Sequence, residues 1–379
     1  MKVLILPSYY ITDYVSRNFR INIKYILQIL SRFDFNYENA KQYFWSNEHY
    51  YFGHIPKIIG EKNTFIVGNY CNDYKINEIP FNTRFPSLHK TPKSTNISFK
   101  ECLNRINEFE VIIIGARTGE FGKRLRTLSR KKDIFTVCLD YPDHPEVYRE
   151  DLIENPNLIT RGLKFKDDFD IYFKHDVPKN YESTYLYPLC PTPINFDNYP
   201  KLKFRSFNDK KISISFLGRM HSELQKERGV LVDYFKNSFK DTFFKGFESN
   251  DNKRTTLEFY SEVINKSKIV FSPSGKVWDS ARHAEPALYN SIPLISKPNC
   301  KLANDINISE ENSIFYELEL NNNLKIKNTD YLADKISFIL NNEQEYTKLS
   351  NAWLNEMKSK NTLEKRSEYI INIIKEKIK

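Results

Sequence analysis

The sequence predicts an α/β protein with two domains, each built on a parallel sheet. At 379 residues the chain is long enough for two domains of about 150 residues each. Short, continuous apolar runs alternate with helical segments in both halves, which is typical of parallel strands covered on both faces. A proline-rich stretch over 188–211 separates the two series and is the expected linker. We expect an N-terminal domain over 1–195, a C-terminal domain over 205–345 and closing helices over 346–379.

The first half begins with an apolar run that Pro7 ends, as expected of a buried strand. The run EVIIIG is closed by Gly115, and IFTVCLD ends in the acidic residue Asp140. Prolines predict a loop over 80–98. The expected strands are 2–7, 64–67, 110–115, 134–140 and 170–173. The expected helices are 18–33, 99–109 and the basic segment 120–131.

The second half repeats this alternation. Its expected strands are 212–218, 242–246, 268–272 and 293–296, and its expected helices are 228–235, 257–265, 280–290 and several from about residue 330 onward. Open α/β sheets bind ligands at the carboxyl ends of their strands, so a binding cleft is expected between the two domains.

The amino-acid composition favours anionic partners and argues against zinc sites, disulfide scaffolds and membrane-spanning proteins. Lys and Arg total 57 against 48 Asp and Glu, and the net charge of +9 favours anionic partners. The five cysteines are scattered without a CxxC pair, which argues against a zinc site or disulfide scaffold and fits the cytoplasm. No apolar run is long enough to span a membrane, and the N-terminal run is too short for a signal peptide.

The segment Ser267–Pro298 carries the most chemical information. Its strand ends in a loop of small residues followed by a lysine, where main-chain N–H groups can approach an anion closely. The loop residues that we expect to bind are Ser272, Ser274, Gly275 and Lys276.

The helix after this loop adds a cation and an acid on one face. Asp279 or Ser280 is expected to cap it, and Arg282 lies in its first turn. A guanidinium there suits a diphosphate. Glu285 follows three residues later and can accept hydrogen bonds from ribose hydroxyls. On their own, Arg282 and Glu285 also fit a solvated ion pair, but their setting between two strands favours nucleotide-sugar binding.

The order strand–SPSG–x4–S-x-R-x-x-E-x6-IPL-I resembles the donor-site signature of exostosin-like and related bacterial glycosyltransferases of the GT-B architecture. The resemblance covers residues 210–320. It implies two Rossmann-like domains facing a cleft, with C-terminal helices packing back on the first. It also implies that Arg282 contacts the donor diphosphate, that Glu285 binds the ribose, and that Ser274 and Gly275 line the phosphate loop. Gly218 and Arg219 resemble the FxG turn beside the donor phosphates.

Three positions depart from the family pattern: Asn290 replaces the usual Gly, Ala287 a Leu and Pro286 an Ala. Asn tolerates left-handed backbone angles. Proline inside a helix removes a hydrogen bond, so the helix is expected to start late or bend at Glu285.

The first domain is expected to bind the acceptor and supply a base. The candidates for the base follow a buried strand directly and are Asp140, Asp143 and His144. Simple turn capping is the alternative. Three further basic residues follow strands and are expected in the cleft, with an ordinary surface role as the alternative: Arg117, Lys174 and His175.

No metal site is expected. Asp168-Phe169-Asp170 has the letters of a metal-binding motif, but it precedes a strand and is interpreted as a turn. The only co-substrate expected is the nucleotide sugar, and no further cofactor is expected.

The basic stretch 123–132 is interpreted as a solvated helix face, with docking to an anionic membrane as the alternative. It lacks the interleaved aromatic residues of a nucleic-acid site. The amphipathic C-terminal helix is expected to pack on the first domain rather than on a membrane.

We therefore expect a cytoplasmic, metal-independent glycosyltransferase, peripheral at most to the inner membrane face. It would move a sugar to a hydroxyl of a glycan or lipid-linked glycan in cell-surface polysaccharide synthesis, and the resemblance favours inversion. The alternatives are a non-catalytic basic protein that binds nucleic acid or another polyanion, and an epimerase or phosphorylase of similar fold.

Overall fold

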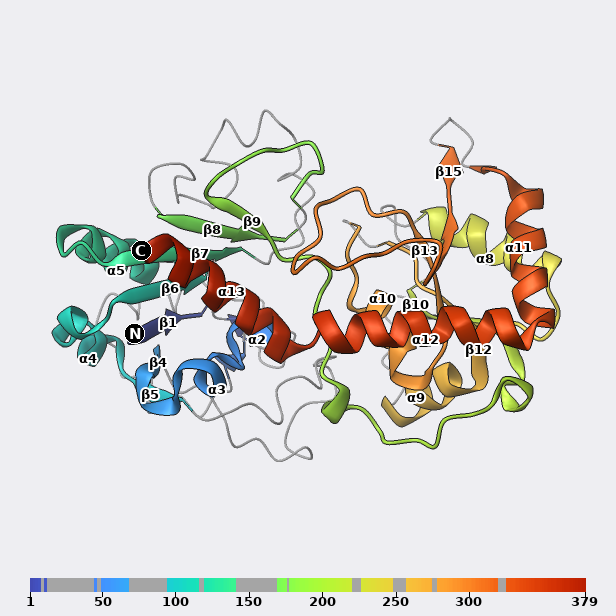
Figure 1. Ribbon diagram of the computed structural model, residues 1–379, viewed down its shortest axis with the longest axis horizontal. Coiled ribbons are helices and arrows are strands. Elements are labelled where there is room, and N and C mark those ends of the chain that lie inside the picture. Colours follow the sequence, from blue (N-terminus) through green and yellow to red (C-terminus); the bar gives the residue numbers. More distant parts are fainter. Residues whose placement is uncertain are drawn as a thin grey trace, which may run out of the picture.

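The computed structural model describes residues 1–7, 10–11, 44–45, 49–67, 94–115, 119–140, 169–175, 177–219, 226–247, 257–274, 278–319 and 325–379. Two parallel sheets lie side by side along the longest axis, and long helices cross in front of both (Figure 1). The expected helix over 18–33 lies outside the described residues.

The first sheet is a seven-stranded parallel sheet in the order β5-β4-β1-β6-β7-β8-β9. Its strands are β1 (Val3–Leu6), β4 (Thr64–Val67), β5 (Thr95–Ile97), β6 (Val111–Gly115), β7 (Phe135–Asp140), β8 (Ile171–Lys174) and β9 (Leu186–Pro188). The helices of this half include α2 (His49–Phe52), α3 (Ile55–Ile59), α4 (Phe99–Asn104) and α5 (Gly119–Lys131). The expected loop over 80–98 is wrong at its end, because β5 pairs there with β4. Edge strands of three residues are too short to show a periodic pattern.

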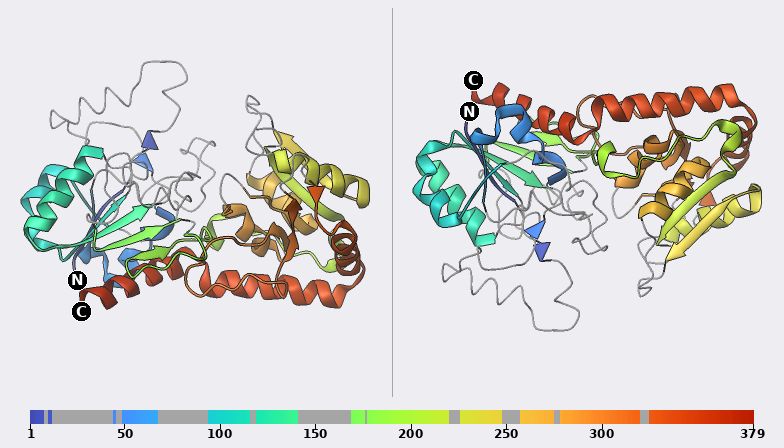
Figure 2. Two further views of the ribbon diagram at one scale, coloured as in Figure 1. Left: turned by 90° about the horizontal axis from the view of Figure 1, so that it is seen from above. Right: turned by 90° about the horizontal axis from the view of Figure 1, so that it is seen from below.

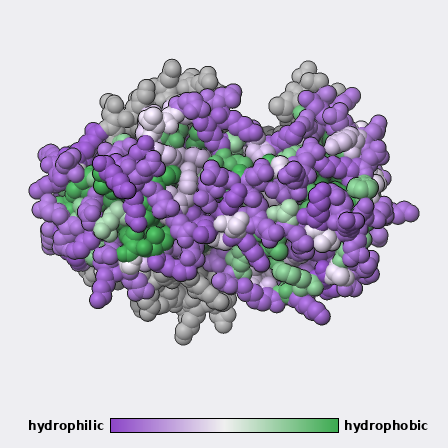
Figure 3. All heavy atoms as spheres, in the orientation of Figure 1, coloured by the Kyte–Doolittle hydropathy of each residue, from purple (hydrophilic) through white to green (hydrophobic). Residues whose placement is uncertain are grey.

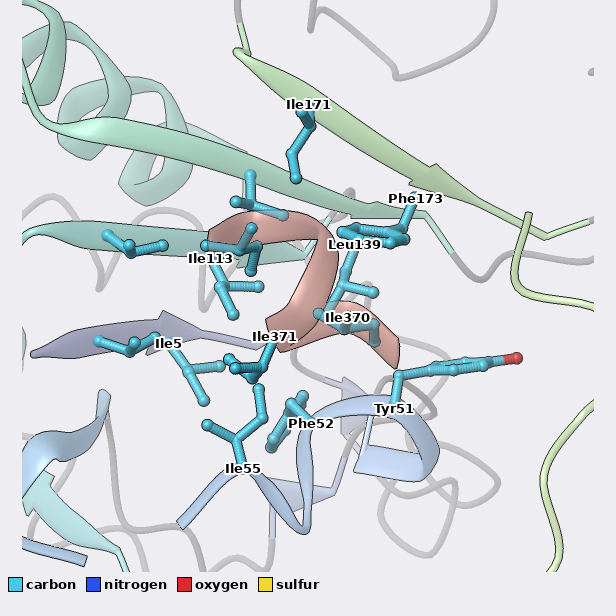
Figure 4. Close-up of a cluster of buried hydrophobic side chains, with 14 of the residues drawn as sticks. Ile5, Tyr51, Phe52, Ile55, Ile113, Leu139, Ile171, Phe173, Ile370 and Ile371 are labelled. Carbon is cyan, nitrogen blue, oxygen red and sulfur yellow. The ribbon is translucent and has the colours of Figure 1, made fainter. Parts of the chain in front are cut away.

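Both faces of this sheet are buried, as its continuous apolar runs predict. Ile5, Ile113 and Leu139 point to one face, where Ile370 and Ile371 of the last helix pack against them (Figure 4). The opposite face packs against side chains from α4 and α5. The C-terminal helix is thus part of the first core.

The second sheet has five parallel strands in the order β11-β10-β12-β13-β14. They are β10 (Ile212–Arg219), β11 (Phe243–Phe247), β12 (Ser267–Phe271), β13 (Ile292–Ser296) and β14 (Ile314–Tyr316). The helices around it include α8 (Lys226–Ser238), α9 (Leu257–Lys266), α10 (Ala281–Ala284) and the 3₁₀ helix η11 (Glu285–Tyr289). Two small antiparallel pairs complete the strands: β2 (Tyr10–Ile11) with β3 (Phe44–Trp45), and β15 (Leu318–Glu319) with β16 (Lys325–Ile326).

The helix was expected to start late or bend at Glu285, and it changes from an α-helix to a 3₁₀ helix there. The α-helix ends at Ala284, and η11 carries the chain on to Asn290. Asn290 takes a left-handed conformation, with φ 53° and ψ 50°. Asparagine can therefore replace glycine at this position, because its short polar side chain tolerates the left-handed region of backbone angles.

Three helices end the chain: α11 (Thr329–Asn341), α12 (Glu343–Lys360) and α13 (Leu363–Ile378). Figure 2 shows α12 running along the second half and α13 returning to the first. Trp353 and Met357 of α12 pack against η11, whereas α13 packs against α2 and α3. The return of the C-terminal helices to the first domain is therefore confirmed.

The connecting segment, residues 189–211, joins β9 to β10, and its first part, 189–194, is buried rather than an exposed linker. Leu189, Cys190 and Ile194 are buried. The buried guanidinium of Arg366 donates from Nη1 to the carbonyl of Leu189 and from Nη2 to that of Pro191 at 3.0 Å. The segment is thus fixed to the helix that returns to the first sheet.

The face that carries α12 and α13 is mainly polar (Figure 3). Figure 3 shows hydrophilic side chains over most of the face that carries α12 and α13, with hydrophobic ones in small groups. Among the described residues, none of the helices combines the length and the apolar character that crossing a bilayer requires.

Candidate functional site

A buried histidine, His283, forms a hydrogen bond to the start of the loop after β12. Ser272 is fully buried, and its Oγ lies 2.8 Å from Nδ1 of His283. The other ring nitrogen, Nε2, lies 2.7 Å from the carbonyl oxygen of Trp278. A carbonyl only accepts, so Nε2 carries the hydrogen and Nδ1 of a neutral ring accepts from the Ser272 hydroxyl. The hydroxyl of Ser272 therefore forms an internal hydrogen bond that helps to fix the start of the loop.

Ser274 joins three elements at the same edge of the sheet. Its Oγ lies 2.8 Å from Oγ of Ser296, which ends β13, and its carbonyl accepts a hydrogen bond from Nη2 of Arg228 at 3.1 Å. Arg228 lies in the first turn of α8 and is 7% exposed. Arg228 was not among the predicted site residues, although an arginine in the first turn of a helix after a strand is the same signal as Arg282. Gly275 and Lys276 lie outside the described residues.

Arg282 lies against the end of β10. A Cβ atom placed on Gly218 would collide with Nη1 of Arg282 and lie 3.1 Å from its Cζ. The guanidinium carbon also lies 6.0 Å from the ring centroid of Phe216, within cation–π range. Arg282 is half-buried, and no carboxylate pairs with it within the described ranges. The expected proximity of Gly218 and Arg282 is therefore present. Arg219 ends β10, and its side chain is outside the description.

Gly218→Ala tests this close approach. The new methyl group would also lie 2.7 Å from Cζ of the buried Phe216, so Arg282 and Phe216 must both move. We expect anion binding at this site to weaken about tenfold and stability to fall by roughly 1–3 kcal/mol. Gly229→Ala is the matched control, because a Cβ there meets nothing within 4 Å. Equal binding by the two variants, measured by calorimetry, would show that Arg282 does not depend on Gly218.

Glu285 is 8% exposed and is held by two phenols. Tyr199 donates to its Oε1 at 3.0 Å, and Tyr260 donates to its Oε2. Tyr199 belongs to the connecting segment and Tyr260 to α9, so neither was visible as a partner in the sequence. Ser280 caps α10, as one of the two expected caps, by accepting from the N–H of Arg282 at 3.4 Å.

Asp279 has a different role from the expected cap. Its Oδ2 accepts from the main-chain N–H of Thr192 at 2.9 Å and from the Thr192 hydroxyl at 2.6 Å. It is also in direct contact with Nε2 of His175, the residue that follows β8. The carboxyl ends of the two sheets therefore meet at one buried contact between His175 and Asp279.

Cys190 lies beside this contact, and its sulfur, Nε2 of His175 and a carboxylate oxygen of Asp279 are within 4.8 Å of one another. Two ligands of one tetrahedral zinc ion lie roughly 3.3 Å apart. His175 and Asp279 are in closer, hydrogen-bonding contact, so this arrangement fits a hydrogen-bonded junction better than a metal centre.

Asp140 is buried, and its carboxylate is already paired with two neighbouring side chains. Its Oδ2 lies 2.9 Å from Nζ of Lys174 and accepts from the Tyr172 hydroxyl at 2.8 Å. Burial, with Asp140 next in importance, raises the pKa of Tyr172 well above its usual value, so this phenol stays a donor. Lys174 and His175 were expected in the cleft, and each contacts a buried carboxylate, that of Asp140 and that of Asp279. Asp143, His144 and Arg117 lie outside the described residues.

Asp170 of the Asp168-Phe169-Asp170 motif forms hydrogen bonds to a strand of the first sheet. Its Oδ2 accepts from the N–H of Thr136 at 2.6 Å and from its hydroxyl at 2.9 Å. This pairing is consistent with the expected turn before β8.

No protein-family model matches the chain, and no curated protein sequence matches it either. Solved structures do match in fold. HepE from Anabaena, with UDP, aligns at a TM-score of 0.51 with 10% identity, over 99% of this chain and 100% of that one. An α-glucosyltransferase in complex with UDP-glucose and DNA containing an abasic site aligns at 0.51 with 11% identity, over 99% of both chains. A glycosyltransferase from Rickettsia africae aligns at 0.50 with 11% identity, over 100% and 98%.

The chain spans 57% of the length of S. aureus TarM, which it also matches with a TM-score of 0.46 and 14% identity, over 73% of this chain. Together with the two parallel sheets, the full-length alignments show the fold of the GT-B glycosyltransferases. The exostosin-like subtype stays a prediction.

Proposed function

We propose that this protein transfers a sugar from a nucleotide-sugar donor to a hydroxyl group of a glycan acceptor. The observation that carries the proposal is the half-buried Arg282 guanidinium, lying against Gly218 at the carboxyl end of a parallel strand. It has no carboxylate partner among the described residues. A partly buried cation without an anion favours an anionic ligand, and a diphosphate matches the guanidinium fork.

The surrounding groups suit a leaving nucleoside diphosphate. Arg228 and Ser296 hold Ser274, so the start of the loop after β12 is fixed before the donor arrives. Lys276 follows this loop in sequence, and Arg219 follows Gly218. In the proposed mechanism these cations stabilise the negative charge that develops as the glycosidic bond to the diphosphate breaks, without requiring a metal ion.

The donor nucleotide is proposed from the fold relatives. The HepE structures contain UDP and UDP-glucose, and the α-glucosyltransferase structure contains UDP-glucose. UDP and its sugars are therefore the first probes.

The base is proposed to come from the first domain. Asp143 and His144 follow β7 within four residues of its end, and the ends of the two sheets meet at His175 and Asp279. Asp140 is less suited, because Lys174 and Tyr172 already occupy its carboxylate. Either Asp143 or His144 would accept the proton of the acceptor hydroxyl as it attacks the sugar.

We also propose that the enzyme works in the cytoplasm on glycans of the cell surface, including lipid-linked ones. The five cysteines are scattered along the sequence without a CxxC pair, as in proteins of a reducing compartment. The exposed basic face of α5, which includes Lys123, Arg124 and Lys131, offers a surface for anionic lipid.

A thermal-shift panel tests the proposal. UDP, GDP, CDP and their sugars are added to the full chain at about 100 times a micromolar Kd, and the nucleotide that fits should stabilise it by roughly 2.7 kcal/mol. A polyanion such as heparin is the control for non-specific binding, which falls steeply with salt. If heparin stabilises the protein and no nucleotide does, the protein is a polyanion binder and the proposal fails.

A further inference from the structure

We propose that Tyr199 and Tyr260 are positioning residues that fix Glu285 for both hydroxyls of the donor ribose. The site would then select ribonucleotides over 2′-deoxyribonucleotides. This inference rests on the proposed function and deepens it, because it names the two side chains that make the ribose contact selective.

Each oxygen of the Glu285 carboxylate receives one phenol. Tyr199 donates to Oε1 at 3.0 Å, and Tyr260 donates to Oε2. Glu285 is only 8% exposed, so an ionised carboxylate there needs donors to replace the water that it has lost. The described residues provide no ion pair to Glu285, and the two phenols are its hydrogen-bond donors there.

The lone pairs of the carboxylate match a vicinal diol. A carboxylate has about four lone-pair positions, two on each oxygen. One phenol on each oxygen leaves one lone-pair position on each oxygen for a further donor. The 2′- and 3′-hydroxyls of a ribose offer two adjacent O–H donors, so they would complete the set with one hydrogen bond to each oxygen. A 2′-deoxyribose leaves one buried position without a donor, and such a loss is costly.

The two phenols come from separate parts of the fold, which fixes the carboxylate in two directions. Tyr260 is carried by α9, whose residues pack against η11. Tyr199 is carried by the connecting segment, which is fixed at Thr192 by Asp279 and at Ile194 by the main chain of Asn361. Arg282 lies three residues before Glu285, and at helical spacing the Cβ atoms of such residues are about 5–6 Å apart. This separation suits a diphosphate and the ribose attached to it.

A nearby tyrosine provides a matched control. Tyr289 belongs to the same cluster, but its hydroxyl donates to the carbonyl of Pro200 at 3.0 Å rather than to Glu285. Tyr289→Phe removes a buried phenol hydroxyl from the same region without removing a donor to the carboxylate.

The experiment compares Kd values of UDP with 2′-deoxy-UDP, and of GDP with 2′-deoxy-GDP, by calorimetry on the full chain. The wild type should bind the ribonucleotide about tenfold more tightly than its deoxy form. In Tyr199→Phe, Tyr260→Phe and the double variant, this ratio should fall towards one, mainly through weaker ribonucleotide binding. Tyr289→Phe should keep the wild-type ratio. Glu285→Gln should lose the ratio as the tyrosine variants do.

The ratio is independent of simple loss of folded protein, because both nucleotides are measured on the same sample. A wild-type ratio that persists in both single tyrosine variants and in the double variant would overturn the inference while leaving nucleotide binding established. If the wild type binds none of the four nucleotides, the proposed function fails and this inference fails with it.

Discussion

Replacing Arg282 with alanine is expected to weaken binding of the nucleoside diphosphate about 100-fold. The variant removes a half-buried guanidinium that a diphosphate would engage through two charge-assisted hydrogen bonds. Such bonds contribute roughly 1.5–3 kcal/mol each, and 100-fold corresponds to about 2.7 kcal/mol. Calorimetry with UDP, or with whichever nucleotide stabilises the wild type, measures the change.

Arg105→Ala is the control for this variant. Arg105 is at the end of α4 and pairs with Glu101 and Glu108, far along the chain from the second sheet. Its removal lowers the net charge equally but should leave the Kd unchanged. Arg282→Lys should recover only part of the affinity, because an ammonium cannot make the paired contact of a guanidinium. A Kd for Arg282→Ala equal to that of Arg105→Ala would mean that the diphosphate binds elsewhere.

Lys210→Met is expected to lower the free energy of unfolding by roughly 3 kcal/mol at pH 7. Lys210 is 3% exposed, and its amine donates to three main-chain carbonyls, those of Asn265 at 3.1 Å, Ser267 at 3.0 Å and Tyr289 at 3.0 Å. Two of these carbonyls lie at the ends of α9 and η11, so the amine links the two helix ends. Without the amine these buried acceptors lose their donor.

Urea unfolding, followed by tryptophan fluorescence, measures the effect, because Trp278 and Trp353 both lie in the second half. Lys211→Met is the matched control: Lys211 is the next residue, is exposed, and donates only to the carbonyl of Asn208 at 2.8 Å within the described chain. Equal stability of the two variants would show that Lys210 does not hold the helix ends together.

Lys210 should also make the free energy of unfolding depend on pH. Burial lowers the pKa of Lys210 from 10.5 to about 7 in the folded protein. Between these two values the unfolded chain binds more protons than the folded one, so the stability that depends on Lys210 increases with pH. The difference in unfolding free energy between wild type and Lys210→Met should therefore be larger at pH 9 than at pH 7. A smaller difference at pH 9 would contradict this shift.

The central strands could be predicted closely from the sequence, and the edges could not. β6 and β7 lie within a residue of the expected ranges, because buried parallel strands read as unbroken apolar runs. β5, β9 and β14 are three residues long and at or near sheet edges, so no periodicity marks them.

The candidate site shows the same division. The loop, Arg282 and Glu285 follow from a local order of residues within one segment, and Gly218 from the end of the preceding strand. The side chains that hold them come from distant positions: Arg228 for the loop, Tyr199 and Tyr260 for Glu285. Local sequence patterns cannot show which distant tyrosine hydroxyl will contact which carboxylate, because that depends on how the chain folds.

The sequence by itself determined the alternation of strands and helices, the interruption of the helix at Glu285 and the residues suited to an anion, because each depends on chain geometry within a few residues. Only the tertiary structure decided that Asp279 joins His175 rather than capping a helix, and that Asp140 and Lys174 neutralise each other. Those pairings depend on which groups are buried together, since a charge removed from water must find a partner wherever the fold places one.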